Sequence, residues 1–221
     1  MADREPSGTM ETPRTEVLKL FPTPVFIATI PGAEALNAEL KRIILEQEQA
    51  SGGVERSNRG GWQSSWDMYE WGGEPIRRVL NFARAMVDDA TVDRSGRHHQ
   101  IAWRINCWAN VNRTGHGNQF HTHPGGLWSV SYYVDDGGVD ADRSLGGEFE
   151  IADPRGAATV MYAPQLTFRG QDGLSLGESE RLTPRSGAMI VFPSWLWHGV
   201  CPYRGTRERI SIAINFSIAS A

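Results

Sequence analysis

The sequence predicts a mainly β fold of the jelly-roll type, supported by helices in its N-terminal half. Three observations lead to this prediction. Helical periodicity is confined to two segments before residue 90. From His99 onward, short apolar and β-branched runs alternate with Gly, Pro and Asp, which is the pattern of a sandwich or jelly roll. The last run, 209–218, alternates Ile or Phe with small and polar residues and so has one strongly apolar face.

Length and composition are those of a single globular domain. The chain has 221 residues, of which 40% are hydrophobic and 22% charged. Residues 1–14 are rich in Pro, Ser, Thr and charge, so we expect a flexible tail there. We expect residues 15–221 to form one domain, with helical support at about 33–90 and a jelly-roll core at about 99–218.

Short β-type runs predict nine strands. The first two, 17–21 and 25–30, are separated by Pro22 and Pro24, and prolines confine such strands to a sheet edge or a bend. The other seven follow the helices, at 101–111, 127–134, 148–151, 159–163, 166–169, 188–192 and 209–218.

Two helices are predicted between the first strands and the others. In 33–49 and 74–89, apolar residues recur at helical spacing. Gly52-Gly53 ends the first helix, and Pro75 suits the first turn of the second. The segment between them, 57–73, is rich in Gly and Trp, and we expect it to be a loop anchored by its tryptophans.

Charge, hydropathy and cysteine content argue against several classes of protein. Twenty-two basic and 26 acidic residues leave a net charge of -4, without a basic block that could follow a phosphate backbone, so nucleic acid is not an expected partner. The N-terminal residues contain no apolar run, which argues against a signal peptide or membrane span and favours a cytoplasmic protein. Cys107 and Cys201 form no CxxC pair, so neither a disulfide framework nor a thiolate zinc site is expected.

Histidines gather in the predicted β region. His121 and His123 are two residues apart, so in an extended chain both side chains point to the same side. His198 follows an apolar run that ends in a proline turn, and a jelly roll can bring this distant strand beside the pair. We therefore predict one metal site made by these three imidazoles, with other coordination positions open for substrate and O2. Imidazole suits iron, copper, nickel and zinc alike, so the ligands alone leave the metal open.

Other polar residues of this region are further candidates. Asn106 lies on one face of its predicted strand, where it either contacts a small molecule or forms an ordinary core hydrogen bond. His116 lies in a Gly-rich turn and is either a substrate contact, a group behind the metal ligands or a solvated side chain. Glu148 and Glu150 are the alternative source of a carboxylate ligand.

Arg209 and Ser211 form a second candidate pair. They are two residues apart in the last predicted strand and therefore share a face. A buried guanidinium can hold a carboxylate through two parallel hydrogen bonds, which would suit an acidic small molecule. The alternative is that Arg209 belongs to a solvated basic cluster with Arg204 and Arg207.

These motifs resemble those of the iron(II)/2-oxoglutarate-dependent oxygenases, whose double-stranded β-helix has an HxD or HxE pair, a distal His and a later Arg. The chain is most similar to a bacterial and phage branch of that family. The shared segments are FPTP at 21–24, GGWQS at 60–64, HTHP at 121–124, FPSWLWH at 192–198 and RISIAIN at 209–215.

The resemblance implies a site and its cofactors. Fe(II) would be bound by His121, His123 and His198, with 2-oxoglutarate and O2 as cosubstrates. Arg209 and Ser211 would hold the 2-oxoglutarate carboxylate. Further candidate contacts to the cosubstrate are Tyr133 and Asn106.

The expected reaction is hydroxylation of a small molecule through an iron(IV)-oxo species, and the candidate substrate contacts are Trp62, Trp128 and His116. Position 123 departs from the wider family, which places a carboxylate there, so this site is one negative charge poorer. Two alternatives remain open. One is a cupin-type three-His dioxygenase independent of 2-oxoglutarate, and the other is a metal-binding or small-molecule-binding barrel without turnover.

Overall fold

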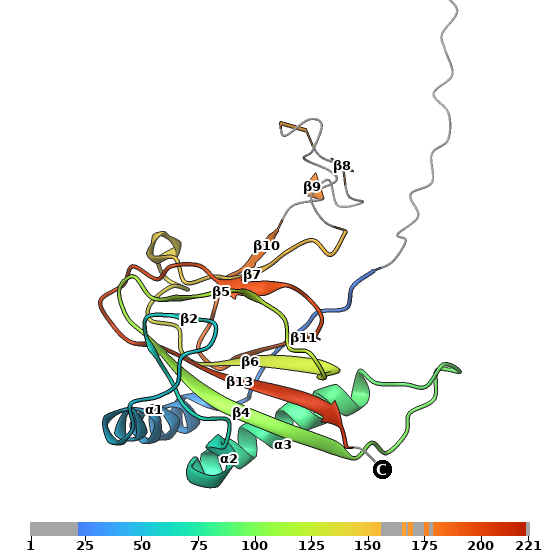
Figure 1. Cartoon of the computed structure of the whole chain (residues 1–221), viewed down its shortest axis with the longest axis horizontal. Coiled ribbons are helices and arrows are strands. Elements are labelled where there is room, and N and C mark those ends of the chain that lie inside the picture. Colours follow the sequence, from blue (N-terminus) through green and yellow to red (C-terminus); the bar gives the residue numbers. More distant parts are fainter. Residues whose placement is uncertain (1–21, 156–164, 167, 170–174, 177–178, 220–221) are drawn as a thin grey trace, which may run out of the picture.

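Two antiparallel sheets face each other, and the helices cover the outer side of the larger sheet (Figure 1). The computed structural model describes residues 22–155, 165–166, 168–169, 175–176 and 179–219. The two sheets and the helices that cover the larger one confirm the predicted mainly β, jelly-roll fold with N-terminal helices. The expected tail at 1–14 and the expected strands at 17–21 and 159–163 lie outside the described residues.

The larger sheet has six strands and contains most of the strands predicted from the sequence. Across the sheet they are β1 (Phe26–Thr29), β11 (Ala188–Pro193), β6 (Trp128–Asp135), β13 (Arg209–Ile218), β4 (Trp103–Asn112) and β3 (Trp62–Gln63). β1 lies at an edge, as the prolines before it predict. β13 pairs along its length with β4 on one side and β6 on the other, so it organises the sheet.

The smaller sheet is made of short strands. In order they are β10 (Glu180–Leu182), β7 (Phe149–Ile151), β12 (His198–Val200), β5 (Gly117–His121) and β2 (Asn58–Arg59). A separate pair is formed by β8 (Phe168–Arg169) and β9 (Ser175–Leu176), and a 3-10 helix, η1, spans Arg143–Leu145. Apart from β7 and β8, the sequence predicted none of these strands, because two to five residues are too few to show alternation.

The helices agree closely with the periodicity. They are α1 (Ala33–Ala50), α3 (Gly73–Asp89) and the one-turn α2 (Met68–Trp71). The predicted bounds of α1 and α3 are correct to within one residue. The loop predicted at 57–73 is only partly correct, because this segment also forms β2, β3 and α2. α1 and α3 both pack on β6, and α2 packs on β4.

Alternation along the strands separates an apolar layer from a polar one. Ile210, Ile212, Ile214 and Phe216 of β13 are fully buried in the core that the large sheet shares with the helices. Arg209, Ser211, Ala213 and Asn215, which alternate with them along the strand, therefore face the space between the two sheets. A second buried cluster, with Phe149, Ile190 and Phe192, occupies part of that space. The rest of it is lined by polar and aromatic groups, and these make the candidate site.

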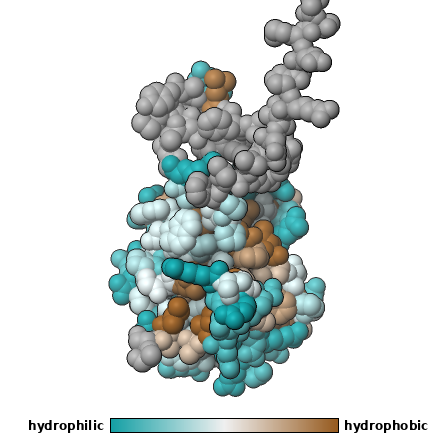
Figure 2. Space-filling model, turned by 90° about the vertical axis from the view of Figure 1, so that its right-hand side faces the viewer, coloured by the Kyte–Doolittle hydropathy of each residue, from teal (hydrophilic) through white to brown (hydrophobic). Residues whose placement is uncertain are grey.

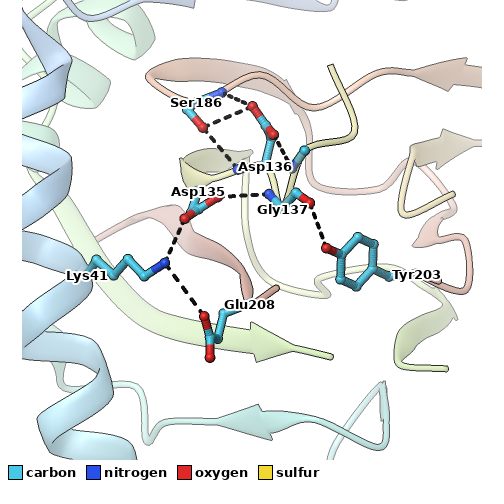
Figure 3. A network of polar contacts seen from close by, with 8 residues as sticks. Lys41, Asp135, Asp136, Gly137, Ser186, Tyr203 and Glu208 are labelled. Atoms are coloured by element: carbon cyan, nitrogen blue, oxygen red, sulfur yellow. Dashed lines mark hydrogen bonds and ion pairs between the residues drawn. The ribbon is translucent and has the colours of Figure 1, made fainter. Parts of the chain in front are cut away.

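A polar network joins α1 to the ends of β6 and β13 (Figure 3). The Lys41 ammonium donates to Asp135 at 2.8 Å and lies 3.6 Å from the carboxylate of Glu208. Tyr203 donates its hydroxyl proton to the carbonyl oxygen of Gly137 at 2.7 Å. These contacts hold the turn after β6 in place beside Arg209.

The surface is largely polar on the face that Figure 2 shows, where hydrophobic residues appear in small patches among hydrophilic and intermediate ones. In the described ranges, no helix combines the length and the apolar character needed to cross a membrane. Cys107 and Cys201 are both free thiols.

The helix–sheet core predicts the cost of truncating Leu40, which is fully buried in α1. Leu40→Ala leaves a cavity under the large sheet and should lower the free energy of unfolding by about 2–5 kcal/mol. Urea denaturation measures this loss. Glu39→Ala, on the exposed side of the same helix, is the control and should change the free energy by less than about 0.5 kcal/mol. Equal effects of the two substitutions would contradict the burial of this face.

Candidate metal centre

The three histidines meet where β5 and β12 pair. His121, the last residue of β5, lies directly opposite His198, the first residue of β12. His123 lies in the turn that follows β5, where its backbone N–H donates to the carbonyl of Ser194 at 2.9 Å. Strand pairing and this turn therefore bring together residues that are far apart in the sequence.

The imidazole rings converge closely enough to share one ion. One ring nitrogen from each histidine lies within 4.8 Å of the other two. The Nε2 atoms of His121 and His123 are 3.1 Å apart. Ring centroids are 4.4 Å apart for His121 and His198, 4.9 Å for His123 and His198, and 5.0 Å for His121 and His123. This donor set suits a divalent transition metal.

Hydrogen bonds at Nδ1 direct the Nε2 atoms toward the centre. Nδ1 of His121 donates to the carbonyl of Gln119, and Nδ1 of His198 donates to the carbonyl of Leu196, each at 2.8 Å. Because a carbonyl only accepts, both rings hold their proton on Nδ1 and keep a lone pair on Nε2. Nδ1 of His123 lies 2.8 Å from the hydroxyl oxygen of Ser129.

Burial keeps these imidazoles in the form that binds metal. Desolvation lowers the pKa of His121, although the Gln119 carbonyl opposes the shift. Desolvation and the nearby His121 lower the pKa of His123 to about 4. The same two causes lower the pKa of His198 to about 3. The rings are therefore neutral at pH 7, and no proton has to leave an imidazolium before a metal binds.

The structure gives no support to a carboxylate ligand from Glu148 or Glu150, which lie just before and within β7. Phe149 and Ile151 point into the core between the sheets, so their neighbours Glu148 and Glu150 point outward. Glu150 instead accepts from the Arg181 Nε at 3.2 Å. Among the described residues, the cluster consists of histidines alone.

Arg209 is a buried cation without an acidic partner in the described part of the chain. It is 1% exposed, whereas Arg204 and Arg207 are exposed, so the alternative of a solvated basic cluster does not hold for Arg209. Its Nε donates to the carbonyl of Gly147 at 3.0 Å, and its guanidinium carbon lies 5.3 Å from the centre of the Tyr133 ring. Burial lowers the pKa of the guanidinium, a sign of how much its charge costs there.

Glycines make room for this side chain. A Cβ on Gly137 would lie 3.1 Å from the Cβ of Arg209, and a Cβ on Gly147 would lie 3.1 Å from its Cδ and Nε. Both glycines also have positive φ, 71° and 77°. Any larger residue at these positions would therefore push on the arginine and strain the backbone.

Buried polar atoms without partners surround Arg209. In the described chain, its Nη2, the Tyr133 hydroxyl, and one amide atom each of Asn110 and Asn112 have no hydrogen-bond partner. Strand register places them together, because Arg209 lies opposite Asn112 while Ser211 lies between Asn110 and Tyr133. Unpaired buried groups are costly, so such a cluster indicates a ligand. A cation and a phenol fit the carboxylate of 2-oxoglutarate.

A cavity of about 630 Å³ lies over two of the histidines. Besides His121 and His123, its lining includes Asn106 and Asn215, which lie opposite each other on β4 and β13. The remaining wall includes Arg56, Trp66, Trp108 and Phe120. The guanidinium carbon of Arg56 lies 5.4 Å from the centre of the Trp66 ring. The cavity therefore offers aromatic surface and polar groups next to the imidazoles.

The expected substrate contacts Trp62, Trp128 and His116 do not line this cavity. Trp62 and Trp128 belong to the helix-side core, where their indole N–H groups donate to the Ser51 carbonyl and the Thr91 hydroxyl, each at 2.9 Å. Alternation along β6 explains why Trp128 points into the helix-side core: its neighbour Ser129 points to the opposite face, toward the histidines. His116 accepts from the backbone N–H of Arg113 at 3.0 Å.

Several residues of the site were missed by the sequence analysis. Ser129 and Asn215 could have been found, because alternation places them on the same faces as Tyr133 and Arg209. Ser57 could not, since only folding brings its hydroxyl to 3.4 Å from the Nε2 of His121.

Comparisons with solved structures identify the same fold. A prolyl hydroxylase from Trichoplax adhaerens, solved with a hypoxia inducible factor peptide fragment, has a TM-score of 0.60 at 14% identity, covering 88% of this chain and 83% of that one. A Pseudomonas putida prolyl-4-hydroxylase has a TM-score of 0.58 at 18% identity, covering 89% and 94%. HygX from Streptomyces hygroscopicus, with nickel and 2-oxoglutarate bound, has a TM-score of 0.55 at 13% identity, covering 89% and 83%.

Comparison with family models gives the family itself. No curated protein matches the chain. The model described as "Putative 2OG-Fe(II) oxygenase" matches residues 106–215, a segment that contains all three clustered histidines and Arg209. The chain therefore belongs to the 2OG-Fe(II) oxygenases, enzymes that use Fe(II), 2-oxoglutarate and O2.

Proposed function

We propose that this oxygenase holds Fe(II) with His121, His123 and His198 and hydroxylates a small molecule. The observation that supports the proposal most strongly is the convergence of three neutral imidazoles in the same domain as a buried arginine without an acidic partner among the described residues. When bound, the iron together with 2-oxoglutarate supplies the oxidising power needed to attack an unreactive C–H bond. The protein has to hold both reactants and exclude water.

The pocket for 2-oxoglutarate runs along β13 in this proposal. Arg209, with Ser211 and Tyr133, holds the carboxylate farther from the metal, where two parallel charge-assisted hydrogen bonds can form. The strand then leads to Asn215, which lies opposite Ser129, the residue that contacts His123. The chain thus provides a polar path from the buried arginine to the histidines, with the apolar core behind it.

The cavity over the histidines is the substrate site in this proposal. Its volume of about 630 Å³ falls within the range of about 300–1,000 Å³ that is usual for small-molecule sites. Trp66, Trp108 and Phe120 offer flat apolar surface, and Asn106 offers a hydrogen-bonding group beside them. The similar Trichoplax adhaerens structure contains a peptide fragment, so candidate substrates for screening include both small molecules and short peptides.

The buried arginine favours this proposal over its rivals. A cupin-type three-His dioxygenase needs no 2-oxoglutarate, and a barrel without turnover needs neither cosubstrate. Neither accounts for a fully buried guanidinium among unpaired polar atoms.

Turnover of the cosubstrate tests the proposed function directly. Protein loaded with Fe(II) under anaerobic conditions and then given 2-oxoglutarate and O2 should form succinate, which chromatography quantifies. Candidate substrates should increase the yield. A product that forms equally without 2-oxoglutarate would favour the cupin-type reaction. No succinate with or without candidate substrates, together with no effect of Arg209→Ala on 2-oxoglutarate binding, would rule the proposal out.

The triad predicts a loss of metal on truncation. His198→Ala and His121→Ala remove a ligand each and should abolish stoichiometric iron binding, as measured by metal analysis of anaerobically reconstituted protein. His98→Ala, at an exposed position distant in sequence from the cluster, is the matched control and should keep the full iron content. Full iron in both triad variants would show that the metal is held elsewhere.

The arginine predicts weaker binding of 2-oxoglutarate. Arg209→Met keeps much of the side-chain volume but removes charge-assisted hydrogen bonds worth about 1.5–3 kcal/mol, so the KM for 2-oxoglutarate should rise roughly 10- to 100-fold. Steady-state succinate formation measures this change, and Tyr133→Phe should give a smaller rise. The control is Arg207→Met, which alters an exposed neighbour. An unchanged KM for 2-oxoglutarate in Arg209→Met would show that Arg209 does not bind the cosubstrate.

A further inference from the structure

Three buried or half-buried side chains behind His123 form a continuous hydrogen-bonded group, the Ser129–Asn215–Ser194 cluster. The hydroxyl oxygen of Ser129 lies 2.8 Å from Nδ1 of His123 and 2.8 Å from the hydroxyl oxygen of Ser194. Ser129 also donates to the Oδ1 of Asn215 at 2.8 Å. Ser129 and Ser194 are fully buried, so water cannot replace these contacts.

Strand pairing holds this cluster in place. Ser129 lies opposite Asn215 of β13 on one side and opposite Phe192 of β11 on the other. Ser194 follows β11 directly, and its carbonyl accepts from the backbone N–H of His123. Both the backbone and the ring of His123 are therefore attached to the same part of the large sheet.

The cluster also determines where the proton of His123 resides. Ser129 has one hydroxyl proton and donates it to the Oδ1 of Asn215. Toward His123, the hydroxyl oxygen can then act only as an acceptor, so Nδ1 has to be the protonated nitrogen. The lone pair is left on Nε2, which faces the Nε2 of His121 at 3.1 Å.

His123 differs from the other two ligands in what orients it. His121 and His198 donate to backbone carbonyls, which no side-chain substitution removes. The ring of His123 instead has a side-chain hydroxyl, that of Ser129, as the partner of its Nδ1. This dependence is specific to an imidazole, because either ring nitrogen can hold the proton, and the wrong choice points N–H at the metal. A carboxylate at this position would have no such ambiguity.

We propose that Ser129 and Asn215 are positioning residues that hold His123 in its Nδ1-protonated form and so let an imidazole replace a carboxylate as a metal ligand. The inference rests on the proposed function, in which His123 binds the metal. To that function it adds the two residues that an imidazole ligand at position 123 requires.

Metal affinity is the first measurement. Ser129→Ala should raise the Kd for Co(II), titrated under anaerobic conditions and followed by its visible absorption, by about 10- to 100-fold. Asn215→Ala should weaken binding in the same direction. Ser131→Ala is the matched control, because it removes a hydroxyl two residues along the same strand and on the same face, and its Kd should not change. Thermal unfolding checks that each variant is folded.

Two further measurements separate positioning from a general structural effect. Long-range ¹⁵N–¹H spectra of histidine-labelled protein without metal should show the Nδ1-protonated ring for His123, and Ser129→Ala should let the Nε2-protonated form appear. In a His123→Asp background, where no tautomer has to be chosen, Ser129→Ala should cause no further loss of Co(II) affinity.

The outcomes distinguish a failure of the positioning role from a failure of the proposed metal site. If Ser129→Ala binds Co(II) like the wild type while His123→Ala does not, the positioning role is wrong and the triad stands. An equal loss from Ser129→Ala in the His123→Asp background would show a merely structural role and would also overturn the inference. If His123→Ala itself binds Co(II) normally, the proposed triad fails.

Discussion

The antiparallel register between β5 and β12 is the constraint on which the candidate site depends, because it sets His121 directly opposite His198. Side chains alternate along a strand, so a slip of one residue would turn one imidazole away from the other. β12 also pairs with β7 on its other side, which places His198 opposite Ile151. Phe149 and Phe192 pack around the His198 ring, with centroids 5.4 Å and 4.7 Å away. Register and packing together hold the His198 ring in one position.

The two faces of the large sheet have different roles: one packs on the helices and stabilises the fold, and the other carries the polar groups of the candidate site. The isoleucines of β13 and the apolar faces of α1 and α3 form a core that is shielded from the site. This core is the main apolar contribution to folding, since stabilisation grows with the apolar area removed from water. The other face can therefore hold groups that cost stability, above all the guanidinium of Arg209 and the unpaired hydroxyl of Tyr133. A ligand that pairs with them would offset this cost.

Long elements were predictable from the sequence, and most of the short ones were not. α1, α3 and β13 extend over ten or more residues, and their periodicity gave bounds that are correct to within one residue. β5 and β12 contain two of the three clustered histidines, yet neither shows an alternation long enough to be recognised. Their extended conformation comes from pairing with each other, a tertiary interaction. The same reason explains β2 and β3 in a segment expected to be a loop.

The sequence by itself indicated which residues could do chemistry: His121, His123 and His198 by type and spacing, and Arg209 with Ser211 by alternation along the strand that contains them. It also contained the signals for the fold and the family. Only the tertiary structure decided which tryptophans face the cavity, that Glu148 and Glu150 point away from the histidines, and that Ser129 and Asn215 stand behind His123. The physical reason is that periodicity shows which residues share a face, whereas the partner of that face depends on strand order and register across the whole sheet.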